Sequence, residues 1–163
     1  MSYRTIKLKK YLDIVEEYAA HEAMYPGTLV ELISTDKVRK HATAQGNVLP
    51  MFALEDELQG NGIDDAFAAN DKVQVFVPQR GEMVYAILKD GENVAIGDFL
   101  ESAGGGLLQK HVADTWASNN TGTIYAGSIV AQAIEALDLS GSSGTETPDS
   151  VLGYNKRIAV RIV

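Results

Sequence analysis

Short stretches in which apolar and polar residues alternate, each closed by a turn, constrain this chain more than any other feature. The clearest covers residues 72–78, where Val73, Val75 and Val77 occupy every second position. Such alternation is typical of a β-strand with one buried face. Further strands are expected at 28–33, 41–44, 83–88, 99–102, 107–111 and 158–162. Strands separated by turns about every eight to twelve residues predict a mainly β fold with little helix, a barrel or sandwich.

The turns between these strands are marked by glycine, proline and acidic residues. We expect turns at 36–39 and 79–82, and a hairpin turn of the Asp-Gly type at 89–93. Three consecutive glycines at 104–106 predict a tight turn that pairs 107–111 back onto 99–102. The acidic segment 55–71 is expected to form a surface loop with one helical turn at 63–69.

Two segments allow both helix and strand. At 10–24 the spacing of Leu12, Val15 and Ala19 suits an amphipathic helix, whereas the alternation just before it, at 6–9, suits a strand. At 128–137 the alanines favour helix by propensity. A strand there would pair with the alternating end of the chain, and we predict a strand.

The charge balance bears on possible partners. The net charge is −8, from 22 acidic and 14 basic residues, which disfavours direct binding to nucleic acid. The chain has no cysteine, so disulfides and thiol chemistry are excluded. The first ten residues lack the apolar core of a secretory signal, and no apolar run has membrane-spanning length. We expect a soluble protein, made in a cytoplasm, without a membrane partner.

Residues that could carry chemistry are present but poorly arranged for it. The acidic cluster Glu55, Asp56, Glu57, Asp64 and Asp65 does not match the spacing of a calcium loop. The three histidines are far apart in the sequence and show no metal-ligand spacing. The glycine run lacks the Lys-Ser/Thr of a phosphate-binding loop. We therefore predict no catalytic residues, no cofactor, no metal site and no enzymatic activity.

Three aromatic residues are candidates for an interface. Trp116, Tyr125 and Tyr154 occupy loop-like or strand-edge positions. Aromatic side chains at such positions serve either as core residues or as anchors of a protein–protein contact. The sequence leaves both interpretations open.

Several motifs occur along the chain in a fixed order: YPGTLVE at 25–31, ALEDELQG at 53–60 with IDDAF at 63–67, GEMV at 81–84, VAIGDFL at 94–100, and the closing pair at 127–139 and 157–163. Together they resemble the head decoration (capsid cement) proteins of tailed bacteriophages. Each motif alone is weak, and their order carries the resemblance. It covers nearly all of residues 25–163.

The resemblance implies a compact β-barrel or β-tulip-like domain at 25–163 and an extended N-terminal arm at 1–24. It implies a homotrimer at the three-fold and quasi-three-fold axes of an icosahedral head, bound to the major capsid protein. Such a protein would lie on the outer capsid surface of the virion, after assembly in the host bacterial cytoplasm. It would stabilise the expanded head against the pressure of packaged DNA.

The N-terminal segment is basic, although the chain as a whole is acidic, which agrees with an arm that contacts another protein. The residues expected to bind the capsid are Ile6, Lys7, Leu8, Lys9, Lys10, Tyr11 and Leu12. Three arms in one trimer would bind together through their effective concentration.

A second interpretation is a biotinyl- or lipoyl-like carrier, or another swivelling β-domain. Lys89 beside Asp90-Gly91 would then be the modified lysine on a hairpin. Its flanking residues do not match the carrier motif, and a shared fold says little about function.

Overall fold

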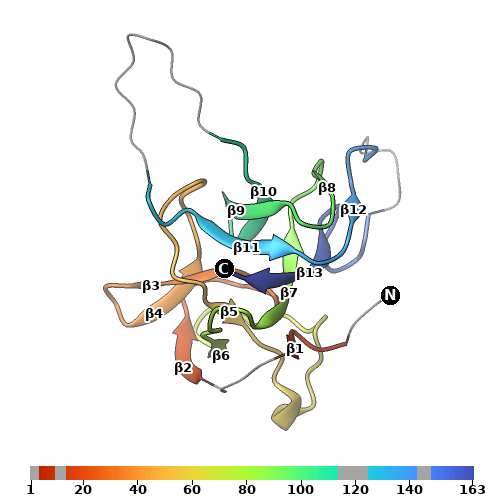
Figure 1. The fold of residues 1–163 in the computed structure, drawn as a ribbon. Coiled ribbons are helices and arrows are strands. Elements are labelled where there is room, and N and C mark those ends of the chain that lie inside the picture. The colour runs from red at the N-terminus through yellow and green to blue at the C-terminus, as the bar shows by residue number, and fades with distance from the viewer. Residues whose placement is uncertain (1–3, 10–13, 114–124, 143–147) are drawn as a thin grey trace.

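A computed structural model describes residues 4–9, 14–113, 125–142 and 148–163 of the chain (Figure 1). This part of the chain is mainly β, with one 3-10 turn, η1 (Glu57–Gln59), and no α-helix. The mainly β fold predicted from the sequence is confirmed. The strands are β1 (Lys7–Lys9), β2 (Val15–Ala20), β3 (Val30–Ile33), β4 (Lys37–Lys40), β5 (Phe52–Ala53), β6 (Lys72–Phe76), β7 (Met83–Leu88), β8 (Asn93–Val94), β9 (Phe99–Gly104), β10 (Leu107–Lys110), β11 (Ile129–Ala133), β12 (Leu137–Asp138) and β13 (Lys156–Ile162).

Five strands close into a barrel. Their order is β7-β10-β9-β11-β13, and β13 pairs back onto β7 in an antiparallel register from Lys156–Leu88 to Arg161–Met83. β10 meets β7 only at Leu108–Leu88, which leaves room on the same strand for β1 at Met83 and Val84. Closure removes the free strand edges at which β-proteins associate non-specifically.

A second sheet has the order β3-β4-β2-β6-β5, and a bridge between Leu29 and Phe52 joins its two ends. Alternation along β6 sends Val73 and Val75 into a small buried cluster inside this sheet. Phe76, the next residue, lies in the barrel cluster instead. β6 therefore contributes to both layers of the core. A short ribbon of β8 and β12 completes the fold.

The two sheets share the larger core. Phe52 and Phe76 of the second sheet are fully buried in one cluster with Leu100, Leu108 and Ile158 of the barrel. The sheets are thus layers of one folding unit and not separate domains, because each covers apolar surface that the other leaves open.

Several of the predicted strands are confirmed at their expected positions. β7 spans the expected 83–88, β6 lies within 72–78, and β10 pairs with β9 across the glycine turn. The strand predicted within 128–137 is present as β11, and it pairs with β13. Buried alternation therefore outweighs the helix propensity of the alanines in this segment.

The prediction of a turn at 36–39 is wrong. The chain turns earlier, where Asp36 N donates to Ile33 O at 3.0 Å and Asp36 has a φ of 57°. Residues 37–40 then form β4 against β3, with the buried Val38 opposite Leu32 and Arg39 opposite Glu31. One buried valine and one cross-strand ion pair stabilise this strand, although its polar composition does not predict a strand. The strand expected at 41–44 does not form.

The prediction of a hairpin at 89–93 is also wrong, because the strands on either side of this turn pair with other strands and not with each other. β7 pairs with β13, and β8 pairs with β12. The helical turn expected at 63–69 lies earlier in the loop, at η1.

The described residues of the expected N-terminal arm are part of the body. Residues 6–9 lie along β7, where Tyr85 N donates to Ile6 O at 2.8 Å. β2 pairs with β6 from Val15–Phe76 to Ala19–Lys72, so the strand alternative holds here. Ile6 is fully buried, and this burial explains why the segment does not extend into solvent. The boundary expected at residue 24 therefore has no counterpart in the strand pairing.

Candidate functional site

The outer face of the barrel at β9 presents an unusual mixture of side chains. We call Phe99, Glu101, Gln109, His111 and Ile129 the outer barrel face. Alternation along β9 turns the intervening Leu100 into the core and leaves Phe99 and Glu101 on the opposite side. Glu101 stands opposite Gln109 on β10 and opposite Ile129 on β11. His111 N donates to Phe99 O at 2.8 Å and completes the set.

A buried carboxylate occupies the centre of this face. Glu101 is 1% exposed, its Oε2 lies 2.6 Å from His111 Nδ1, and its Oε1 accepts a hydrogen bond from Gln109 Nε2 at 2.9 Å. An isolated buried carboxylate would cost several kcal/mol, so these two donors are what make its position tolerable. These contacts join Glu101 of β9 to Gln109 of β10 and to His111, which follows β10.

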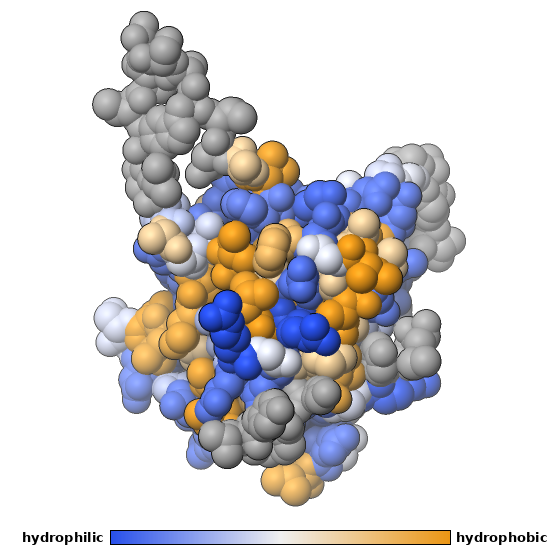
Figure 2. Space-filling model, viewed as in Figure 1, coloured by the Kyte–Doolittle hydropathy of each residue, from blue (hydrophilic) through white to orange (hydrophobic). Residues whose placement is uncertain are grey.

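Exposed apolar side chains flank this carboxylate. Phe99 is 46% exposed and Ile129 is 40% exposed, although both belong to strands of the barrel. Nearby positions in the chain add further exposed apolar surface, from Ile96, Val112 and Tyr125. In the view that faces β11 and β13, orange apolar surface is interrupted by blue polar patches (Figure 2). Where exposed apolar residues form a contiguous patch, they mark a contact surface, so these positions are candidates for one.

The predicted interface aromatics have different surroundings. Tyr125 is exposed at the start of the segment that leads into β11, as an interface residue would be. Tyr154 is half-buried and has an interaction partner. Trp116 lies outside the described residues.

Three of the seven residues predicted to bind a capsid through an arm, Ile6, Lys7 and Leu8, are engaged within the body. Ile6 belongs to the core, Leu8 packs against it, and Lys7 Nζ lies 5.8 Å from the centroid of the Phe76 ring. The expectation that Ile6 contacts a capsid is therefore wrong, because no surface of it is available. Lys9 lies on β1, and its side chain, like the whole of Lys10, Tyr11 and Leu12, is outside the described part of the chain.

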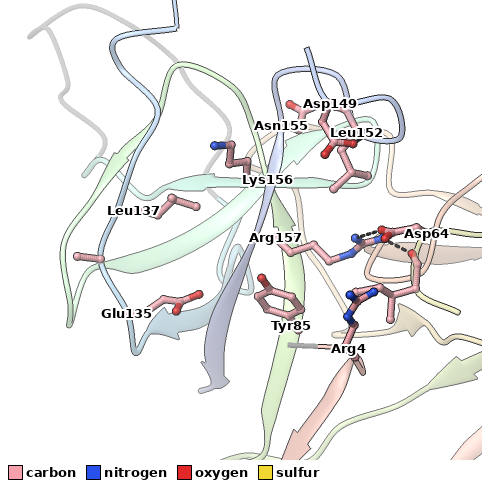
Figure 3. Close-up of a pocket in the computed structure, with 12 residues that line it drawn as sticks. Arg4, Asp64, Tyr85, Glu135, Leu137, Asp149, Leu152, Asn155, Lys156 and Arg157 are labelled. Atoms are coloured by element: carbon pink, nitrogen blue, oxygen red, sulfur yellow. Dashed lines mark hydrogen bonds and ion pairs between the residues drawn. The ribbon is translucent and has the colours of Figure 1, made fainter. Parts of the chain in front are cut away.

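A pocket of about 480 Å³ lies where the barrel meets the acidic loop (Figure 3). Arg157 extends from β13 across it toward Asp64, with Nη1 2.8 Å from Asp64 Oδ1. Its Nε and Nη2 donate to Pro26 O at 3.2 and 3.1 Å, and Nη2 also donates to Ile63 O. With its hydrogen-bonding capacity used in this way, Arg157 cross-links three segments and is not free to bind a ligand.

The acidic residues singled out from the sequence do not form one cluster. Glu55 accepts hydrogen bonds from Thr5 and from the backbone N of Ile6, and so holds the start of β1. Asp64 pairs with Arg157, and Glu57 lies in η1. Asp56 and Asp65 line a different pocket. Among the described residues, no group of three or more His, Asp or Glu side chains could hold a metal ion.

The chain has a serine–histidine contact, but it is enclosed. His41 Nδ1 lies 2.8 Å from Ser102 Oγ, and His41 Nε2 lies 3.1 Å from Asn47 O. Ser102 is fully buried, and its Oγ also accepts a hydrogen bond from Gly104 N. A nucleophile needs access to its substrate, so this pair serves to join the barrel to the segment that follows β4.

Lys89, the lysine of the carrier interpretation, is exposed at the end of β7. It does not stand at the tip of a hairpin, because β7 and β8 do not pair with each other. Its backbone N donates to Leu108 O at 2.9 Å, which ties it to β10. The geometry that presents a carrier lysine is therefore not seen at this position.

Sequence reasoning missed the outer barrel face, although a signal was present. The hairpin predicted across the glycine turn puts position 101 opposite position 109, and this register brings His111 close to Glu101. His111 looked isolated only because its partner is brought to it by strand pairing. Arg157 gave no comparable signal, because its partners lie more than ninety positions away in the sequence.

Comparison with known protein families gives no match, and no curated protein matches the chain. Within the described residues, no helix is long and apolar enough to cross a membrane.

Proposed function

We propose that this protein is a structural binding protein that decorates the outside of the expanded head of a tailed bacteriophage. In this proposal it binds the major capsid protein as a homotrimer at the three-fold and quasi-three-fold axes. It stabilises the shell against the pressure of packaged DNA and has no enzymatic role. It belongs to the virion, and its net charge of −8 suits a surface that does not touch the DNA itself.

The observation that carries the proposal is the outer barrel face. Phe99 and Ile129 are exposed on strands of a closed barrel. Rigid, preformed apolar contacts lose little conformational entropy when a partner covers them. The ordered motifs that resemble the cement proteins supply the identity of the partner.

Trimer formation would strengthen a modest individual contact. Each protomer presents only a few exposed apolar side chains on this face, and burying them contributes about 25 cal/mol per Å². Three linked contacts act through effective concentration and can exceed a single one by about 10²–10⁴ in affinity. Because Ile6, Lys7 and Leu8 lie within the body, the proposed contact includes the barrel surface.

The experiment is co-sedimentation of the full chain with purified empty expanded capsids, together with the mass of the free protein by size-exclusion light scattering. Phe99→Asp combined with Ile129→Asp is expected to weaken capsid binding at least about tenfold, because charge would be buried at the contact. Leu58→Asp is the matched control, since Leu58 is 90% exposed on η1 and its loss is expected to leave binding unchanged.

Circular dichroism of each variant separates a lost contact from a lost fold. Failure of the unaltered protein to bind expanded capsids would contradict the proposal. Equal binding by the folded double variant would instead show that the outer barrel face is not the contact.

A further inference from the structure

A second pocket, of about 420 Å³, is formed by residues 56–72, and neither Arg157 nor its partner Asp64 lines it. Oxygen-bearing side chains dominate its lining, namely Asp56, Gln59, Asn61, Asp65, Asn70 and Asp71. Lys72 also lines the pocket, but its Nζ lies 2.6 Å from Glu17 Oε1 and so has its own partner outside the pocket. The lining is therefore rich in acceptors and poor in available positive charge.

Two of the three carboxylates keep one oxygen available. Asp65 Oδ2 accepts a hydrogen bond from Gly62 N at 2.7 Å, and Asp71 Oδ2 accepts one from Ala68 N at 2.7 Å. These bonds within the loop fix the directions of both side chains. The second oxygen of each carboxylate has no partner among the described residues.

Asp56 gives an independent indication of a ligand. The residue is only 7% exposed. Asp56 precedes η1, but its side chain makes no capping hydrogen bond there. The described part of the chain gives its carboxylate no other hydrogen bond and no ion pair. Among the described residues, the side-chain atoms that are both enclosed and without a partner are Asp90 Oδ1 and Ser142 Oγ. The oxygens of Asp56 are not among them, so they remain accessible through the pocket that Asp56 lines. A buried, unpaired carboxylate is costly, and a bound cation would offset that cost.

The set of acceptors bears on the kind of cation. A metal ion needs its ligands converging within about 2.0–2.6 Å, and the described His, Asp and Glu residues provide no such group. A guanidinium carries five N–H donors in a planar fork and bonds at about 2.7–2.9 Å, so it reaches carboxylates that stand farther apart. It can also donate to the amide oxygens of Gln59 and Asn61, whereas that of Asn70 already accepts a hydrogen bond from Lys37 Nζ at 2.7 Å.

We propose that this pocket binds a guanidinium group, with Asp56, Asp65 and Asp71 as its acceptors. The proposal goes beyond the capsid-binding function, because the pocket shares no residue with the outer barrel face. The guanidinium has two possible sources, an arginine side chain of a polypeptide or a free guanidino compound.

The test is a titration of the isotopically labelled full chain, followed by the amide NMR signals of the lining residues. The probes are N-acetyl-arginine amide for a polypeptide arginine, agmatine for a free guanidino compound, and N-acetyl-lysine amide and calcium chloride as competitors of different chemistry. Saturable shifts at the lining residues are expected with the guanidinium probes. Tighter binding of the acetylated amide assigns a polypeptide source, and tighter binding of agmatine assigns a free compound.

Asp56→Asn is expected to weaken guanidinium binding about tenfold or more, since a charge-assisted bond is replaced by a neutral one. The same variant is expected to raise the melting temperature of the unliganded protein, because it removes an unpaired buried charge. Asp36→Asn is the matched control, an exposed aspartate outside the pocket, and it is expected to leave binding unchanged. If Asp56→Asn does not fold, Asp65→Asn tests the same pocket and is expected to weaken binding several-fold.

Three results would overturn the proposal. The first is the absence of saturable shifts at the lining residues with either guanidinium probe. The second is unchanged binding in a folded Asp56→Asn variant. The third is saturation by calcium chloride or by the lysine probe at concentrations where the guanidinium probes do not bind.

Discussion

At the scale of single residues, two adjacent glycines in the turn between β9 and β10 have opposite tolerances. Gly105 and Gly106 both have positive φ, of 60° and 77°. A Cβ on Gly105 would meet nothing within 4 Å, whereas one on Gly106 would lie 2.4 Å from Thr28 Cγ2 and 3.1 Å from Leu29 O. The turn is therefore docked at Gly106 on Thr28 and Leu29, just before β3, and open at Gly105.

Gly105→Ala is expected to cost about 1–2 kcal/mol, the usual penalty for a left-handed alanine. Gly106→Ala is expected to cost about 2 kcal/mol more, because the second sheet must also move away. Urea unfolding of the two variants measures the difference. Equal free energies of unfolding would mean that the turn does not dock on Thr28.

Arg157 provides the second prediction at this scale. Its side chain is 6% exposed and donates to Pro26 O, Ile63 O and Asp64. Arg157→Met leaves buried acceptors without donors and is expected to cost about 2–4 kcal/mol. The matched control is Arg39→Met, which removes an ion pair with Glu31 from a side chain that is 43% exposed, and is expected to cost at most about 1 kcal/mol. Similar losses in the two variants, in urea unfolding, would count against the cross-linking role.

At the scale of elements, β1 decides whether the N-terminus is an arm or part of the body. Ile6→Ala is expected to lower the free energy of unfolding by about 2–4 kcal/mol, because Ile6 is fully buried. Leu58→Ala removes a similar side chain from η1, where it is 90% exposed, and is expected to change stability by less than about 0.5 kcal/mol. A free arm would instead make the two variants alike in thermal unfolding.

The elements that could be predicted from the sequence are those with a strong local pattern. The valines of β6 alternate without interruption, and the pairing of β9 with β10 follows from the glycine turn between them. β4 was missed because only one of its residues, Val38, is apolar and buried. Its stability comes from cross-strand partners that no local window contains.

The candidate sites were harder to predict for a related reason. The acidic residues were recognised, but their roles differ in the folded loop: Asp64 pairs with Arg157, whereas the Asp56 carboxylate has no partner among the described residues. His111 acquires a role only through Glu101. Residue type can be read from the sequence, whereas the identity of a long-range partner depends on strand register.

At the scale of the whole molecule, three aspartates tie stability to pH. The Lys110 side chain, with Ala95 N, lowers the pKa of Asp98, and Val151 N and Leu152 N lower the pKa of Asp149. Hydrogen bonds from Ser140 lower the pKa of Asp138. Because the folded values lie below the unfolded ones, the unfolded chain binds more protons in this range.

Their contribution is present above the ordinary aspartate pKa of about 3.9 and is lost as pH falls through the lowered folded values. The melting temperature is therefore expected to decline as the solution is acidified through this range. Asp98→Asn is expected to make that decline shallower. If the melting temperature of Asp98→Asn falls with pH as steeply as that of the unaltered protein, Asp98 does not contribute to this pH dependence.

The shared core predicts that the barrel and the second sheet unfold together. Phe76 belongs to β6, yet it is fully buried against barrel residues such as Leu108 and Ile158. Neither layer can open without exposing apolar surface of the other, which makes the transition cooperative. Phe76→Ala is expected to cost about 3–5 kcal/mol and to lower one melting temperature for the whole molecule. Calorimetry gives the test: a single transition with equal calorimetric and van't Hoff enthalpies is expected in both proteins, whereas two transitions in the variant would show that the second sheet folds apart from the barrel.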